Sequence, residues 1–144
     1  MPYPMPSRES NVVEPSKGRR VLVVDDQEDS AELMAMLLTN YGHEVAVAHD
    51  GESALVLALE FRPQLAILDL SLPVMDGYRL AGLLRANPVT ASCRLLALSG
   101  YCGEADRIKS KRAGFEQHLA KPLGLDALLT AILADAGTAH VERA

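Results

Sequence analysis

Blocks of hydrophobic and polar residues alternate along this chain, and the blocks differ in period. Short, mostly apolar runs predict strands at 20–24, 44–48, 65–69, 94–99 and 117–120. Longer segments with apolar residues three or four positions apart predict helices near 28–41, 51–61, 75–86, 104–112 and 125–136. This alternation indicates an α/β fold in which helices cover both faces of a parallel sheet.

The composition of the strands predicts their order in the sheet. Segments 20–24, 65–69 and 94–99 are almost continuously apolar, as expected of strands that helices cover on both sides. Segment 44–48 alternates and segment 117–120 carries polar residues, so we place these two at the edges. The order 2-1-3-4-5 meets these conditions, and it defines a doubly wound, flavodoxin-like five-stranded sheet.

Apolar stripes on the helices predict their core faces. The helix near 104–112 offers only Ala105 and Ile108 as anchors, so we expect it to be held least firmly. Asp29 and Glu32 have the spacing of a capping box and predict the start of the first helix. The stripes of the other helices comprise Met34, Leu37, Leu38 and Tyr41; Ala54, Leu57, Ala58 and Phe61; and Leu125, Leu128, Leu129, Ile132 and Leu133.

Length and composition indicate one domain. The 144 residues are 49% hydrophobic and 23% charged, which is typical of a globular chain. We expect the domain at 19–136, a flexible N-terminal tail at 1–18, where Pro, Ser and charged residues leave little to pack, and a C-terminal tail at 137–144. No apolar run suits a membrane span or a secretory signal, so we expect a cytoplasmic protein with no membrane partner.

The net charge of −5 argues against broad binding to nucleic acid. Segment 106–112 nevertheless concentrates four cations on one predicted helix. A solvated helix face is the favoured interpretation of these cations, and a docking surface for an acidic partner is the alternative.

Chemically active residues stand where the predicted strands end. Asp25 and Asp26 follow the first strand, Asp69 closes the third, Ser99 closes the fourth, and Lys121 follows the fifth. In doubly wound sheets, ligands bind beyond the carboxyl ends of the strands, where the strand order reverses. Taken alone, Asp69 could be a loop acid that has reached water; together, the five residues predict a site.

The residue types indicate phosphoryl chemistry at this site. Two carboxylates 4 Å apart repel by about 4 kcal/mol at an effective dielectric of 20, and a divalent cation offsets that repulsion. Oxygen ligands without His or Cys favour Mg²⁺. Lys121 supplies a charge and Ser99 a hydrogen bond for a phosphoryl group, and Asp69 is the natural nucleophile.

The segments VLVVDD, DLSLPVMDG, ALSG and AKP resemble, in this order and spacing, the receiver domain of two-component response regulators, the CheY-like family. The resemblance covers roughly residues 19–136. Each motif alone is weak, but four of them at the ends of four strands form a strong joint signal. The resemblance implies that Asp69 accepts a phosphoryl group from a histidine kinase or a histidine phosphotransfer protein. It also implies a signalling switch and not an enzyme with external substrates.

The resemblance implies a metal site as well. Asp26 and Asp69 would bind Mg²⁺ directly, the backbone carbonyl of Ser71 would be the third protein ligand, and Asp25 would act largely through water. Ser71 also occupies a position that varies in the family and at which hydrolysis of the acyl phosphate tends to be tuned.

The same resemblance implies a conformational switch. Lys121 would contact the phosphoryl group, with a cis peptide bond to Pro122, and Ser99 would turn toward the phosphate. His118 stands where the family usually has Tyr or Phe. An imidazole there could rotate inward, make the output sensitive to pH, or only pack. The favoured interpretation is a partly exposed histidine on an edge strand, and its switch role stays open.

Eight residues follow the last predicted helix, so we expect no output domain. The output would then be contact with a downstream protein through the face formed by 104–112, 117–120 and 125–136, a homodimer being one form of contact. A relay protein and a piece of a hybrid kinase are alternatives. A receiver-like module that binds without phosphorylation, and a Mg²⁺-dependent phosphatase, are the competing functions. The intact site argues against the first, and Ser71 stands where such phosphatases commonly have a second acid.

Overall fold

The computed structural model describes residues 18–100, 103–121 and 125–133. The predicted tails, apart from Gly18, lie outside the described residues, as do Pro122 and the last three residues of the helix expected at 125–136. The elements, in chain order, are β1 (Arg20–Val24), α2 (Glu28–Asn40), β2 (Glu44–Ala48), α3 (Gly51–Phe61), β3 (Leu65–Asp69), α4 (Gly77–Ala86), β4 (Arg94–Ser99), α5 (Glu104–Arg112), β5 (Gln117–Ala120) and α6 (Leu125–Leu133).

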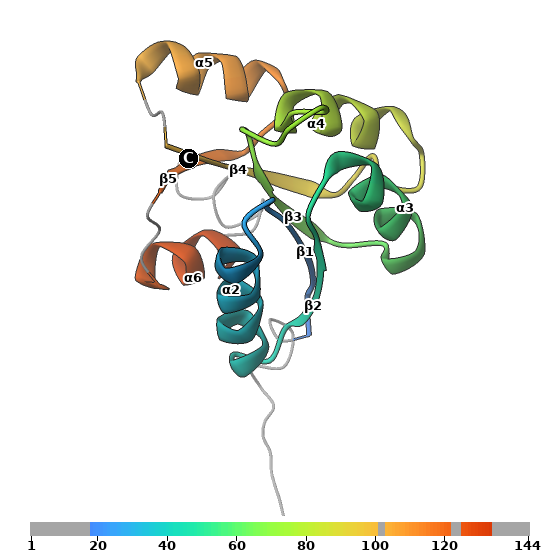
Figure 1. Ribbon diagram of the computed structural model, residues 1–144, viewed down its shortest axis with the longest axis vertical. Coiled ribbons are helices and arrows are strands. Elements are labelled where there is room, and N and C mark those ends of the chain that lie inside the picture. Colours follow the sequence, from blue (N-terminus) through green and yellow to red (C-terminus); the bar gives the residue numbers. More distant parts are fainter. Residues whose placement is uncertain (1–17, 101–102, 122–124, 134–144) are drawn as a thin grey trace, which may run out of the picture.

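The five strands form one parallel sheet in the order β2-β1-β3-β4-β5, which confirms the predicted order. Strands β1, β3 and β4 are almost fully buried, whereas β2 and β5 are the edges. Figure 1 shows α2 and α6 on one face of the sheet, and α3, α4 and α5 on the other. The register places Asp69 beside Leu98, so the carboxyl ends of β3 and β4 lie level.

A hydrophobic core lies on each face of the sheet, because successive residues of a strand point to opposite sides. Leu22 and Val24 of β1 point to the core that α3 and α4 cover, and Val21 and Val23 point to the core beneath α2 and α6. The two cores hold the central strands rigidly and leave the loops at their carboxyl ends to carry chemistry. None of the described helices is both long and apolar enough to cross a membrane.

The first helix has the predicted start but a different N-cap, and it ends one residue before the predicted end. It begins at Glu28 with Gln27 as the N-cap residue, so Asp29 lies inside the first turn and the expected capping box is wrong. The physical reason is that Asp25 accepts a hydrogen bond from the Gln27 N–H, which starts the helical turn at Gln27 and not at Asp29. At the other end, Tyr41 is the C-cap residue and is 54% exposed, so it does not belong to the core stripe.

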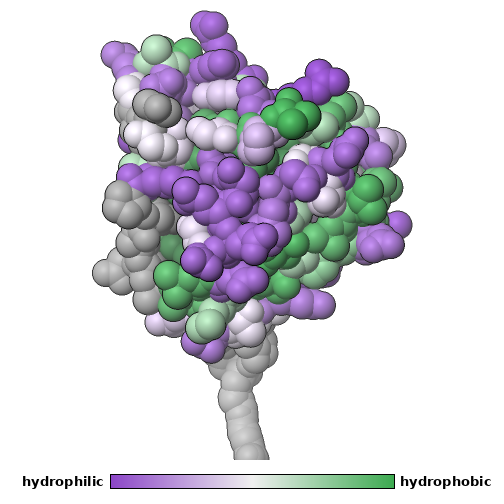
Figure 2. Space-filling model, in the orientation of Figure 1, coloured by the Kyte–Doolittle hydropathy of each residue, from purple (hydrophilic) through white to green (hydrophobic). Residues whose placement is uncertain are grey.

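Helix α5 also differs from the prediction. Ala105 is exposed and Ile108 is 46% exposed, so neither anchors the helix as expected. The buried residue of α5 is Ser110, because the side of the helix that faces the sheet carries this hydroxyl and not an apolar group. In the space-filling view, hydrophilic side chains predominate over α5 (Figure 2).

Candidate functional site

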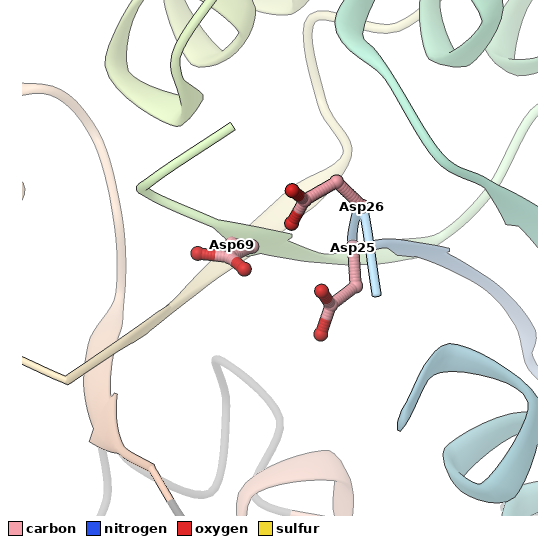
Figure 3. A group of neighbouring side chains, drawn as sticks. All are labelled: Asp25, Asp26 and Asp69. Atoms are coloured by element: carbon pink, nitrogen blue, oxygen red, sulfur yellow. The ribbon is translucent and has the colours of Figure 1, made fainter. Parts of the chain in front are cut away.

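Three of the predicted site residues meet at the carboxyl ends of β1 and β3. Asp25, Asp26 and Asp69 each place a carboxylate oxygen within 4.8 Å of the others. Asp25 and Asp69 are buried, and Asp26 is exposed. Figure 3 shows the pair from the end of β1 and Asp69 from β3 bordering one shared space. The strand order brings them together, because β1 and β3 are neighbours whose connections leave toward opposite faces.

Each buried aspartate uses one carboxylate oxygen to hold the loop that follows it. Asp25 Oδ1 accepts a hydrogen bond from the Gln27 N–H at 3.0 Å, and Asp69 Oδ1 accepts one from the Ser71 N–H at 2.8 Å. Both are bonds from an aspartate to the backbone two residues on, a local pattern that aspartate favours in turns. The other oxygen of each carboxylate, Oδ2, is therefore the one left for further chemistry.

Lys121 lies against both buried carboxylates. Its Nζ donates to Asp69 Oδ2 at 2.8 Å and stands 3.5 Å from Asp25 Oδ2. The backbone N–H of Lys121 donates to the Ser99 carbonyl at 2.9 Å, which fixes the base of the side chain. Burial lowers the pKa of Lys121, but the hydrogen bond and charge of Asp69, and then Asp25, outweigh burial and raise the pKa overall. The amine is therefore an ammonium at neutral pH.

One ammonium does not balance three carboxylates. Burial is the largest effect on Asp25 and raises its pKa; the charge of Asp69 adds to this, while the Gln27 N–H and Lys121 oppose it. Asp25 Oδ2 is buried and lacks a hydrogen-bond partner among the described residues. A buried, under-compensated carboxylate beside two others is a donor set of hard oxygens, and this set fits Mg²⁺.

Gly77 is a residue of the site that the sequence reasoning quoted without giving it a role. A Cβ at this position would lie 2.6 Å from the Asp69 carbonyl oxygen and 2.9 Å from Leu70 Cα. The start of α4 therefore packs directly on the backbone of Asp69, with Asp76 as its N-cap accepting from the Arg79 N–H at 2.9 Å. The Asp-Gly pair shortly after the strand was the signal that could have found it.

His49 is a second residue that sequence reasoning missed. Its Nδ1 lies 2.9 Å from the carbonyl oxygen of Asp25, which ties the end of β2 to the loop that carries the acid pair. Nothing in the local sequence marks this contact, because it joins residues that only the pairing of β1 with β2 brings together.

The remaining predicted residues lie at different distances from the acids. Ser99 is buried at the end of β4, opposite Ala120 of β5. Ser71 is exposed and contacts Asp69 through its N–H. His118 is 8% exposed, so the expectation of a partly exposed histidine is wrong; α5 covers it, and its Nδ1 lies 3.0 Å from Ser110 Oγ.

The chain belongs to the response regulator receiver family, whose sequence model matches residues 21–133. It is 37% identical over 103 residues to an uncharacterized 14.6 kDa protein of Leptolyngbya boryana, covering 72% of this chain and 79% of that one. It is 33% identical over 119 residues to Protein PilG of Pseudomonas aeruginosa, covering 83% and 88%. The match to Response regulator PleD of Caulobacter vibrioides, 35% identical, spans 23% of that protein.

Solved structures agree with this assignment. A response regulator from Chloroflexus aurantiacus is similar with a TM-score of 0.73 at 34% identity, covering 83% of this chain and all (100%) of that one. The chemotaxis response regulator CheY4 of Vibrio cholerae is similar with a TM-score of 0.76 at 28% identity, covering 81% and 97%. The CheY-like, flavodoxin-like fold is thereby confirmed. Receiver domains are signalling switches that bind Mg²⁺ at an acidic pocket and act with histidine kinases and downstream targets.

Proposed function

We propose that this chain is a phosphoacceptor switch of a two-component phosphorelay and that Asp69 is the residue phosphorylated. The observation that carries the proposal is the setting of the Asp69 carboxylate. It is buried, Oδ1 is fixed by the Ser71 N–H, and Oδ2 contacts the Lys121 ammonium. A carboxylate held at a fixed angle beside a cation is suited to attack a phosphorus atom.

The proposed step is a transfer between two side chains. An oxygen of Asp69 attacks the phosphorus of a phosphohistidine on the donor protein, and the P–N bond breaks. The electron pair of that bond stays on the imidazole nitrogen, and the phosphoryl group becomes an acyl phosphate on Asp69. The Lys121 ammonium, which lies 2.8 Å from Asp69 Oδ2, offsets part of the added negative charge.

Asp26, Asp69 and the backbone carbonyl of Ser71 would hold Mg²⁺ directly, with Asp25 acting largely through water. The metal would supply a positive charge that lets the phosphoryl oxygens approach the acids. Hydrogen bonds from the Gln27 and Ser71 N–H groups hold the buried carboxylates in fixed orientations, and burial excludes competing water.

Phosphorylation would reach the surface through Ser99 and His118. Ser99 stands at the end of β4 next to the Lys121 backbone, and His118 stands on β5 beneath α5. A turn of Ser99 toward the phosphate would shift the loop that leads to α5. The output would be a contact of α5, β5 and α6 with a downstream protein or a second copy of the chain. We also propose that residues 19–136 form the receiver domain and that the protein is located in the cytoplasm.

Incubation of the protein with acetyl phosphate and Mg²⁺ tests the proposal by intact-mass measurement. We expect one phosphoryl group per chain, released by alkali or hydroxylamine as an acyl phosphate would be. The adduct is lost in Asp69→Ala and on removal of Mg²⁺. Asp76→Asn is the matched control, because it removes an acid of the same loop but keeps an N-cap for α4.

Three results would contradict this function. An adduct that survives in Asp69→Ala places the phosphoryl group elsewhere. A folded protein that forms no adduct with either acetyl phosphate or a phosphorylated kinase is a module that signals by contact alone. Continuous release of phosphate from phosphate esters, over many cycles per chain, indicates a phosphatase.

A further inference from the structure

A histidine at the end of the neighbouring strand holds the backbone carbonyl of Asp25. His49 directly follows β2 and is half-buried, and its Nδ1 lies 2.9 Å from the Asp25 carbonyl oxygen. A carbonyl oxygen only accepts hydrogen bonds, so Nδ1 must carry the hydrogen and donate it. In the neutral ring, Nε2 is then the nitrogen without a hydrogen. The contact therefore fixes both the tautomer and the orientation of the His49 ring.

Two consecutive residues hold both backbone groups of Asp25. The Asp25 N–H donates to the Ala48 carbonyl at 3.1 Å, and the Asp25 carbonyl accepts from His49 at 2.9 Å. Ala48 is itself fixed, because it pairs with β1 in the sheet. On the other side of His49, Asp50 is the N-cap of α3 and accepts from the Ser53 N–H at 2.8 Å. The backbone of His49 thus lies between two fixed points, from which its ring can hold the carbonyl in place.

The same hydrogen bond bears on Asp26. A peptide group is planar, so the Asp25 carbonyl and the Asp26 N–H belong to one rigid unit. Holding the carbonyl sets the orientation of this plane, and with it the direction in which the Asp26 side chain leaves the backbone. Asp26 is exposed, so its backbone, more than packing, determines where its carboxylate lies. Figure 3 shows Asp25 and Asp26 leaving the end of β1 in different directions, with Asp69 across the shared space.

We propose that His49 is a positioning residue for the metal site. Its Nδ1–H fixes the peptide between Asp25 and Asp26 and thereby orients the Asp26 carboxylate as a ligand of Mg²⁺. A ligand that is already oriented loses less freedom when the ion binds, so the ion is held more tightly. The inference rests on the proposed function, in which Asp26 is a direct metal ligand.

Two substitutions of similar shape isolate the hydrogen bond. His49→Asn keeps an N–H donor, because the asparagine amide nitrogen is as many bonds from the backbone as Nδ1 is. His49→Leu has the same branching but carries a methyl group at that position. Both side chains are neutral, so each variant loses any charge of the imidazole equally. The difference between the two variants therefore measures the effect of the hydrogen bond.

A Mg²⁺ titration of the full, unphosphorylated chain gives the dissociation constant from the NMR shifts of the Gln27 and Ser71 amides. We expect His49→Leu to raise the dissociation constant by about fivefold or more, and His49→Asn to stay within about twofold of the wild type. Ser53→Ala is the matched control for loosening of the same loop. It removes the 3.2 Å bond between Ser53 Oγ and Asp50 without a change of charge, and it should also stay within about twofold.

Phosphorylation by acetyl phosphate supplies a second measurement. At low Mg²⁺, His49→Leu should be phosphorylated more slowly than the wild type. Saturating Mg²⁺ should restore the rate to within about twofold, because the bond orients a metal ligand and not the nucleophile Asp69. The Mg²⁺ titration contains no phosphodonor. A failure of Asp69 to be phosphorylated would leave the metal affinities unchanged, and it is thereby distinguished from a failure of this inference.

Three results overturn the inference. Equal Mg²⁺ affinity in the wild type and in folded His49→Leu means that His49 only supports the fold. Equal losses of affinity in His49→Leu and His49→Asn mean that the ring matters and the hydrogen bond does not. A ¹⁵N spectrum of the metal-free wild type that places the hydrogen of the neutral His49 ring on Nε2 contradicts the bond itself, and this result does not depend on any variant.

Discussion

Helices α4 and α5 cover the same face of the sheet but are attached by different means (Figure 1). Helix α4 buries Gly77, Leu80, Ala81 and Leu84 in the core, whereas the buried residue of α5 is Ser110. Burial of a leucine side chain stabilises a fold by about 1.5–3 kcal/mol, and a hydrogen bond by about 1 kcal/mol net. The difference shows that α4 is part of the core and that α5 is held to it by weaker, polar contacts.

Helix α5 also contacts an aromatic ring of α4 through Lys109. The Lys109 ammonium lies 4.3 Å from the centroid of the Tyr78 ring, and Tyr78 meets Phe115 edge to face at 6.2 Å. Such contacts contribute about 0.5–1.5 kcal/mol each. Tyr78 belongs to α4, so α5 rests partly on its neighbour and can shift at small cost.

The largest expected effect comes from a cavity beneath α4. Leu80→Ala should lower the free energy of unfolding by about 2–5 kcal/mol, because Leu80 is fully buried between α4 and the sheet. Ile108→Ala, its counterpart on α5, should change the free energy by less than about 0.5 kcal/mol. Urea unfolding followed by circular dichroism measures both. Equal losses of unfolding free energy in the two variants would show that α4 and α5 are attached equally firmly.

The two glycines of α4 separate close packing from helix propensity. Gly77→Ala should cost about 1–3 kcal/mol and reduce phosphorylation, because the new Cβ would stand 2.6 Å from the Asp69 carbonyl oxygen. Gly82→Ala should instead stabilise by about 0.5–1 kcal/mol, since nothing lies within 4 Å of its Cβ. The same unfolding and intact-mass measurements apply. If Gly77→Ala proved as stable as Gly82→Ala, the approach of α4 to Asp69 would be looser than described.

Ser110→Ala should loosen α5 alone. It removes the hydrogen bond between Ser110 Oγ and His118 Nδ1, which joins α5 to β5, at a cost of about 1 kcal/mol. Hydrogen exchange should speed up at the amides of α5 and stay unchanged at those of α4, which serves as the internal control. Unchanged exchange in both helices would show that other contacts hold α5 in place.

The smallest expected effect contrasts two buried histidines. His118 has its serine partner, whereas His43 Nδ1 is buried with no hydrogen-bond partner in the part of the chain described. Burial, and then the charge of Arg19, lower the pKa of His43, so the unfolded chain binds its proton more readily. Stability should therefore be lost as pH falls below the ordinary histidine pKa of about 6.5.

Melting temperatures between about pH 7.5 and pH 5.5 measure this loss. The fall should be smaller in His43→Leu, which has no proton to gain. A fall of the same size in the variant and in the wild type would place the titrating groups elsewhere.

The sequence was sufficient for the fold and for the acids, and the reason is local. Periodicity marks strands, and Asp25, Asp26 and Asp69 stand directly at strand ends, so the strand order is enough to bring them together. Contacts between side chains of different elements have no comparable signal in the sequence. The Ser110–His118 bond depends on how α5 is rotated about its axis, and a helix with few apolar residues has no stripe that fixes this rotation.

The missing side chain of Gly77 has a mechanical consequence. Because the first turn of α4 touches the backbone of Asp69, and α4 is itself seated in the core, that side of the strand end acts as a stop. A bulky group added to the Asp69 carboxylate could not be accommodated by a movement of α4 away from the strand end. The structural change would then pass across β4 to α5, which is attached by weaker contacts than α4. The domain would therefore change shape mainly on the α5 side.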